Sequence, residues 1–346
     1  MTTKKFDPTT TISADFGIFG IPLTEAECKL VMLPVPWEVT TSYGKGASHG
    51  PRIIREASEQ IDLFDFETKN AFEAGYFMQE ISEHWISENK KFKAIAQQVI
   101  ALRTEQSEDH ALIEKLVAQV NEASAKLTDW VYTETKKILD AGKLFGLVGG
   151  DHSTPLGAIK AICEKHAGDI GILHIDAHSD TRKAYQGFQQ SHASIMYNVM
   201  QLPIKPKKLV QIGIRDFCED EYNFVKSTPE MKTFFDVELK QRLFKGESWA
   251  SIASDIIQEL PKKVYISFDI DGLDPRYCPS TGTPVIGGLS TDEVFFLFNL
   301  LAQSGRQIVG FDLNEVSPGE AESSEWDGNV GARMLYKLCN WSILTN

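Results

Sequence analysis

The sequence predicts an α/β fold in which a mainly parallel sheet is covered by helices on both faces. Six short apolar runs are typical of buried strands, and they span residues 29–35, 144–149, 170–176, 209–214, 263–270 and 307–313. Helical patterns lie between the later runs, and strands that alternate with helices indicate parallel pairing. Charged residues also follow three of the runs, at the strand ends where α/β proteins place their sites.

The predicted helices carry recognisable start and stop signals. The segment TPLGAIKAICEKH has Pro155 near its first turn, where proline is tolerated. The segment STDEVFFLFNLLAQSG offers Ser290 or Thr291 as its N-cap, continues with acidic residues and stops at Gly305, as amphipathic helices commonly do. Residues 326–341 are predicted to form the last helix.

One stretch departs from the alternation of strands and helices. Residues 80–143 are rich in Glu, Lys, Gln and Ala and show no strand signal, so we expect two helices over 88–105 and 109–141. No Pro-, Gly- or Ser-rich linker bounds the stretch, and such linkers usually separate domains. We therefore interpret 80–143 as a helical insertion within a single domain of residues 1–346.

The composition excludes several classes of protein. A net charge of −13 over 346 residues argues against a nucleic-acid partner, which would require a basic face; it is compatible with a cationic substrate or simply with solubility. No apolar run is long enough for a membrane span, and the stretch MTTKKFDPTT lacks the apolar core of a signal peptide. Five cysteines without a CxxC pair indicate neither a disulfide framework nor a thiolate zinc site, so we expect a cytoplasmic protein.

Three polar segments directly follow or end apolar runs: GLVGGDHSTP with His152; HIDAHSD with Asp176, His178 and Asp180; and SFDIDGLDP with Asp269 and Asp271. Residues two apart on a strand point to the same side, so the candidate side chains within a segment face together. Imidazoles and carboxylates without thiolate suit Mn²⁺ and similar divalent ions. Six donors exceed what one ion needs, and we expect two ions about 3.5–4 Å apart.

Charge balance favours the same interpretation, because ionised carboxylates buried without partners cost several kcal/mol or more. Four carboxylates and two divalent cations cancel, and a bridging hydroxide leaves one negative charge for a cationic substrate. A single DxD or GGDH is usually a turn, so the prediction depends on all three segments together. His174 is interpreted as a core histidine or as a partner of a ligand, and Asp151 and Asp274 as turn residues or partners of this kind.

The three segments resemble the signature blocks of the ureohydrolases, the family that includes arginase and agmatinase. The likeness extends to residues 35–58, 280–290 and 310–318, and it leaves out roughly 60–140 and 219–260. The resemblance implies a three-layer α/β/α sandwich of the arginase type. It also implies two Mn²⁺ per subunit, with Ni²⁺ or Co²⁺ as possible substitutes, and a homo-oligomer, either a trimer or a hexamer.

The resemblance also assigns roles to individual residues. One ion would be held by His152, Asp176, Asp180 and Asp269, and the other by His178, Asp176, Asp269 and Asp271, with Asp176 and Asp269 bridging. Glu315 matches the carboxylate that pairs with the substrate guanidinium, although it could be a surface glutamate. His192 matches a histidine proposed as proton shuttle, or it is a neighbour of a helix cap. Thr283 matches a residue near the mouth of the active site.

The implied enzyme is a C–N hydrolase of linear amidines that releases urea and an amine from a small cationic guanidino substrate. A metal pair lowers the pKa of shared water. Glu315 would orient the guanidinium by a charge-assisted contact, Asp180 could also hydrogen-bond the hydroxide, and Asp180 or His192 would protonate the leaving amine. The absence of a convincing serine or cysteine triad is consistent with this chemistry.

The substrate is less well defined than the reaction. Residues 181–194 are similar to the loop of microbial agmatinase-like enzymes, which favours agmatine, cleaved to putrescine and urea. Arg182 would repel agmatine's distal ammonium if it faced the pocket, so we interpret it as a structural ion-pair partner. Arginine, guanidinobutyrate, guanidine and formimidoylglutamate remain alternatives, as do a catalytically silent metal-binding relative and a deacetylase-like hydrolase with one zinc. The acidic segment 319–327 has no predicted role.

Overall fold

The computed structural model describes residues 17–319 and 325–346, and within these residues eight strands form one parallel sheet in the order β2-β1-β3-β8-β7-β4-β5-β6. The strands are β1 (Leu30–Val35), β2 (Tyr76–Met78), β3 (Leu144–Gly149), β4 (Gly171–Ile175), β5 (Lys208–Ile214), β6 (Met231–Phe235), β7 (Lys263–Asp269) and β8 (Gln307–Asn314). All six predicted strands are confirmed. The two that the sequence patterns missed, β2 and β6, are the edge strands.

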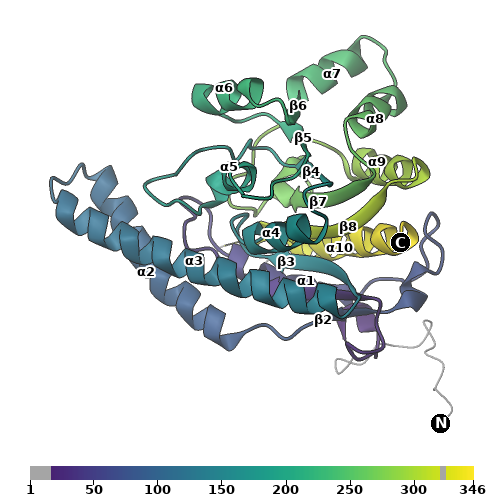
Figure 1. Ribbon diagram of the computed structural model, residues 1–346, viewed down its shortest axis with the longest axis horizontal. Helices are drawn as coiled ribbons and strands as arrows, with labels where there is room; N and C mark the ends of the chain where they lie inside the picture. Colours follow the sequence, from purple (N-terminus) through teal and green to yellow (C-terminus); the bar gives the residue numbers. More distant parts are fainter. Residues whose placement is uncertain (1–16, 320–324) are drawn as a thin grey trace.

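Helices cover both faces of the sheet, so the predicted three-layer α/β/α arrangement is confirmed (Figure 1). One face carries α1 (Gly50–Ser58), α7 (Asp236–Phe244), α8 (Trp249–Gln258), α9 (Thr291–Gln303) and α10 (Glu325–Leu344). The other carries α2 (Glu83–Thr104), α3 (His110–Asp140), α4 (Leu156–Lys165), α5 (Ile195–Met200) and α6 (Glu219–Ser227). Alternate residues of each buried strand supply the two cores: Leu30 of β1 belongs to the first and Val31 to the second.

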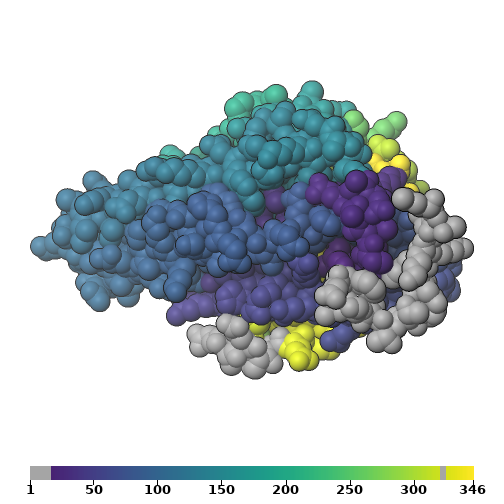
Figure 2. All heavy atoms as spheres, turned by 90° about the horizontal axis from the view of Figure 1, so that it is seen from below, coloured from purple at the N-terminus to yellow at the C-terminus, as the bar shows by residue number. Residues whose placement is uncertain are grey.

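The helical stretch between β2 and β3 is largely part of a layer rather than an appendage. Ser82 caps α2 by accepting a hydrogen bond from the Trp85 backbone N–H, which explains why α2 begins five residues before the predicted 88. Leu127 and Val131 of α3 are buried against α4, and a Cβ on Gly157 would lie 2.2 Å from the Thr128 carbonyl oxygen. Only the far end of the α2–α3 pair projects from the molecule (Figures 1 and 2).

Local signals set the other helix boundaries. Ser290 caps α9 in a capping box with Glu293, and Pro155 occupies the N-cap of α4. None of the described helices combines the length and apolar character required to span a bilayer. Residues 320–324 of the acidic segment, and the N-terminal stretch 1–16, lie outside the described residues.

The topology gathers the three polar segments at one edge of the sheet. All pairings are parallel, so the carboxyl ends of neighbouring β3, β8, β7 and β4 lie together, and α/β proteins bind ligands at such ends. Gly150 permits the close approach of two loops here, since a Cβ on it would lie 1.9 Å from the Trp37 carbonyl oxygen.

Candidate metal centre and substrate cavity

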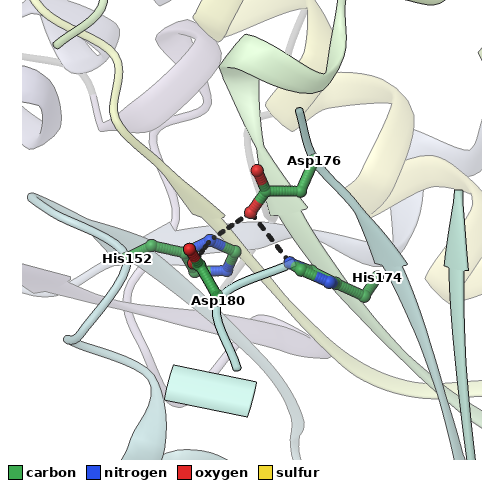
Figure 3. Close-up of side chains that lie close together, drawn as sticks. All are labelled: His152, His174, Asp176 and Asp180. Atoms are coloured by element: carbon green, nitrogen blue, oxygen red, sulfur yellow. Dashed lines mark hydrogen bonds and ion pairs between the residues drawn. The ribbon is translucent and has the colours of Figure 1, made fainter. Parts of the chain in front are cut away.

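Three carboxylates surround the imidazole of His152, which follows β3. Its Nδ1 lies 3.0 Å from Asp176 Oδ2, 3.2 Å from Asp269 Oδ2 and 3.4 Å from Asp180 Oδ2. Asp176 follows β4 and Asp269 ends β7. Asp180 is held in place because its carbonyl accepts hydrogen bonds from the first turn of α5. The structure thus brings together the four residues that the family resemblance assigned to one ion (three of them in Figure 3).

A second group forms on the other side of Asp176. His178 Nδ1 lies 3.1 Å from Asp271 Oδ2 and 3.5 Å from Asp176 Oδ1. Asp176 therefore presents one oxygen to each group, the arrangement expected of a bridging ligand. Asp269 Oδ1 instead accepts a hydrogen bond from the Asp271 backbone N–H at 2.9 Å, which fixes Asp271 at the start of a 3₁₀ turn.

Further polar side chains contact Asp176 and His152. His174 Nε2 lies 2.8 Å from Asp176 Oδ2 and His174 Nδ1 lies 3.0 Å from Gln211 Nε2, so His174 is a direct neighbour of the predicted bridging carboxylate (Figure 3). Donor atoms of His152, His174, Asp176 and Asp180 lie within 4.8 Å of one another. On its other ring nitrogen, His152 contacts Ser267 Oγ at 2.9 Å, and Ser267 donates to Asp312.

The sequence interpretation missed Gln211, Ser267 and Asp312. A sequence signal was available for two of them. Ser267 and Asp269 are two residues apart on β7, as are Asp312 and Asn314 on β8, and residues two apart lie on the same side of a strand. Register pairs Ser267 with Asp312 and Asp269 with Asn314. By contrast Asp151 and Asp274 are turn residues, as expected: Asp151 accepts from the Ser153 backbone N–H, and Asp274 from that of Arg276.

The electrostatics of the cluster favour the binding of cations. Burial raises the pKa of Asp180 and Asp269 well above the usual range, and their carboxylate neighbours raise it further. Burial opposes ionisation of Asp176 too, yet contacts with His174 and His152 hold its pKa well below the usual range. The imidazole of His152 and four carboxylates converge with little access to water, and His178 joins them from the cavity side, where it is 24% exposed. This donor set fits divalent metal ions.

A cavity of about 150 Å³ opens beside the second group. Among the predicted site residues it is lined by His178, Asp180, His192 and Thr283. Burial, with a smaller effect of His178, lowers the pKa of His192 to about 4. Thr283 Oγ1 donates to Asp271 Oδ2 at 3.3 Å. A larger cavity of about 580 Å³ runs along α2, and its lining contains none of the predicted site residues.

Glu315 is buried and is not among the residues that line this cavity. It follows β8, is only 5% exposed, and its Oε1 accepts a hydrogen bond from the His152 backbone N–H at 3.0 Å. Burial raises its pKa well above the usual range, and Asp269 and Asp151 contribute to this shift. Asp180 and Glu315 have φ angles of 53° and 63°, a left-handed conformation that is uncommon outside glycine. The surface interpretation of Glu315 is therefore wrong.

Arg182 lies at the rim of the cavity, paired with a carboxylate. Its Nε lies 3.4 Å from Glu221 Oε2, and its guanidinium lies over the Tyr185 ring, 5.1 Å from the centroid. Tyr185 in turn contacts the His192 ring edge-on at 5.9 Å. The expected ion-pair role of Arg182 agrees with this geometry.

Comparisons with known proteins agree with this site. Residues 28–340 match the arginase family. The chain is 31% identical over 321 residues to N(1)-aminopropylagmatine ureohydrolase of Thermus thermophilus, covering 93% of this chain and 92% of that protein. It is 30% identical over 294 residues to agmatinase of Bacillus anthracis, covering 84% of each. The crystal structure of agmatine ureohydrolase of Thermoplasma volcanium is similar with a TM-score of 0.68, at 22% identity and 92% coverage of each chain.

Proposed function

Because the chain belongs to the arginase family of hydrolases that act on guanidino groups, we propose that it is a binuclear manganese enzyme that releases urea from a small guanidino amine. The observation that carries the proposal is the convergence of imidazole and carboxylate donors on both oxygens of Asp176. This arrangement offers two adjacent groups of ligands that share Asp176, and Asp269, which lies beside His152 and accepts from the Asp271 N–H, is the second proposed bridge.

The proposed ligands are those that the sequence motifs name. His152, Asp176, Asp180 and Asp269 would hold one ion, and His178, Asp176, Asp269 and Asp271 the other. Mn²⁺ suits these oxygen and nitrogen donors, and Ni²⁺ or Co²⁺ could replace it. When bound, a pair of divalent cations lowers the pKa of water and so supplies hydroxide at neutral pH.

The side chains around the ligands would complete the reaction. Glu315 pairs with the substrate guanidinium and orients its carbon toward the nucleophile. Asp180 would hold the nucleophile through a carboxylate oxygen, and His192 or Asp180 would take up the proton that the water loses and deliver it to the leaving nitrogen. The bond from the guanidinium carbon to that nitrogen breaks, so that one water and one guanidinium give urea and an alkylammonium ion.

Agmatine is the substrate we propose, with putrescine and urea as products. Similar proteins are named for agmatine and for N(1)-aminopropylagmatine, and the ion pair of Arg182 with Glu221 removes a charge that would repel an amine tail. N(1)-aminopropylagmatine is therefore the first alternative. We also propose a homo-oligomer, either a trimer or a hexamer, which light scattering would detect as about three or six times the chain's 38.7 kDa.

A substrate panel tests the proposal. Manganese-loaded protein is assayed for urea and ammonia with agmatine, N(1)-aminopropylagmatine, arginine, guanidinobutyrate, guanidine and formimidoylglutamate. We expect urea from agmatine or its aminopropyl derivative at the highest kcat/KM. Release from none of these compounds would instead support a catalytically silent relative.

A further inference from the structure

We propose that Asp216 and Tyr43 form a site at the mouth of the cavity that binds the distal ammonium of the substrate and so selects guanidino compounds with a cationic tail. This inference rests on the proposed function and extends it, because it names the feature by which the enzyme would distinguish one guanidino compound from another. Both residues line the same cavity as His178 and Asp180.

The backbone of Asp216 has a fixed position, and the pairing shown for its carboxylate is a long one to His178. Its backbone N–H and that of Arg215 both donate to the Ala177 carbonyl, at 3.1 and 2.7 Å, which ties Asp216 to the strand end beside His178. Its side chain is 70% exposed. Within the described chain, no lysine or arginine lies within ion-pair distance of it, and His178 Nε2 is 4.0 Å away, beyond hydrogen-bond length.

The neighbouring charged side chains at the rim, Arg182 and Glu221, already have partners. Glu221 is buried and accepts hydrogen bonds from the backbone N–H groups of Thr181 and Cys218, at 3.2 and 3.0 Å, besides its contact with Arg182. Arg182 and Glu221 are therefore paired with each other, and among the described residues Asp216 is the rim carboxylate that has no lysine or arginine within ion-pair distance. A terminal ammonium is attracted to this position, whereas a terminal carboxylate is repelled.

Tyr43 supplies an aromatic face at the same mouth. Its side chain is 77% exposed, but its loop is docked: Gly44 N–H donates to the Gly282 carbonyl at 3.1 Å. A Cβ on Gly44 would lie 2.6 Å from Gly282 Cα, so the two loops touch backbone to backbone. The partner loop also carries Thr283, which hydrogen-bonds Asp271. Alkylammonium groups bind aromatic faces, and Tyr43 lines the cavity from this docked loop, where it would meet a substrate tail.

A competing role for Asp216 is to orient His178 from its outer nitrogen, as carboxylates often do for metal-ligating histidines. That role would affect every substrate equally and would alter metal content. Tail recognition predicts a change only in the preference between substrates with and without the distal charge, so the two roles are separable by experiment.

The test compares agmatine with pentylguanidine, which replaces the distal ammonium by a methyl group. In the manganese-loaded full chain, Asp216→Asn is expected to lower the ratio of kcat/KM for agmatine to that for pentylguanidine by about fivefold, mainly through KM. Tyr43→Leu is expected to lower the same ratio by about threefold. Asp216→Lys is expected to invert the preference between agmatine and 4-guanidinobutyrate. Asp220→Asn, a neighbouring exposed charge outside the cavity lining, is the control and should leave the ratio unchanged.

An unchanged ratio in Asp216→Asn would overturn the inference. Equal losses for both compounds, together with reduced manganese content, would do so as well and would assign Asp216 to positioning His178. Calorimetric binding of agmatine and pentylguanidine to the metal-free full chain measures the same preference as a ratio of Kd values, without turnover. A chain that releases no urea but still prefers agmatine through Asp216 would refute the proposed reaction and leave the tail site standing.

Discussion

Asp180 and Glu315 combine burial with a left-handed backbone. A non-glycine residue in such a conformation costs about 1–3 kcal/mol, and these positions cluster at functional sites. Burial also raises the pKa of both carboxyl groups. Two buried acids in a strained backbone conformation destabilise the folded chain unless they bind a positively charged group. At the scale of single residues, these two positions therefore point to cation binding.

Glu315→Gln tests the proposed pairing with the guanidinium. The amide keeps the size of the side chain and can still accept from the His152 N–H, but it loses the charge that attracts the substrate. Charged hydrogen bonds contribute about 1.5–3 kcal/mol, so kcat/KM should fall about tenfold to over a hundredfold. Manganese content should match the wild type; unaltered kinetics would exclude the pairing.

Asp271→Asn tests the second group of ligands. Asp271 Oδ2 lies 3.1 Å from His178 Nδ1. The asparagine side chain would replace a negatively charged metal ligand by a neutral one. We expect manganese content and urea release to fall together, with about one ion per chain retained by the first group. Wild-type turnover in this variant would show that Asp271 is not a ligand.

The sequence predicted the polar residues that share a strand end, because period-two spacing places them on one side. The contacts between segments could not be read in this way. Both the contact of His152 with Ser267 and the burial of Glu315 depend on how strands far apart in sequence become neighbours. Asp216 was also missed, since a lone acidic residue after a strand resembles any surface charge.

At the scale of elements, α3 connects the helical stretch to the proposed substrate loop. Asn121 of α3 donates to the Gly187 carbonyl at 3.3 Å and accepts from the Gln189 N–H at 2.9 Å. Thr128, two turns further along α3, donates to Gln190 at 2.8 Å. Gly187, Gln189 and Gln190 precede His192 on the loop 181–194, so α3 supports the loop that carries a proposed catalytic residue.

Asn121→Ala should loosen that loop without unfolding the chain. Each lost hydrogen bond contributes about 0.5–1.5 kcal/mol, and we expect KM for agmatine to rise about threefold to tenfold while the melting temperature changes little. Glu122→Ala is the matched control, because Glu122 is 69% exposed and, among the residues that the structure describes, its ion pair is with Lys126 on the same helix. Equal KM values for the two variants would rule out support of the loop by Asn121.

The strands missed by the sequence interpretation share a physical reason. β2 has three residues, too few to show a period. β6 is an edge strand with an exposed Lys232, so its apolar run is broken. Central strands are buried on both faces and read as continuous apolar runs, which is why the other six were predicted within two residues of their observed bounds.

At the scale of the whole molecule, the metal ions should also contribute to stability. The clustered carboxylates repel one another without cations, and a ligand at a hundred times its Kd stabilises the folded state by about 2.7 kcal/mol. Manganese added to chelator-treated protein should raise the melting temperature by about 5 °C or more, and magnesium at equal concentration should do less. Calorimetric scans that coincide with and without manganese would argue against metal binding in the folded chain.

The most direct test of the binuclear site is anomalous diffraction from a crystal of the manganese-loaded protein. Two anomalous peaks per chain are expected, one beside each carboxylate oxygen of Asp176, and His152 and His178 should each contact a different peak. One peak, none, or peaks away from Asp176 would contradict a shared pair of ions and the hydrolytic chemistry proposed from it.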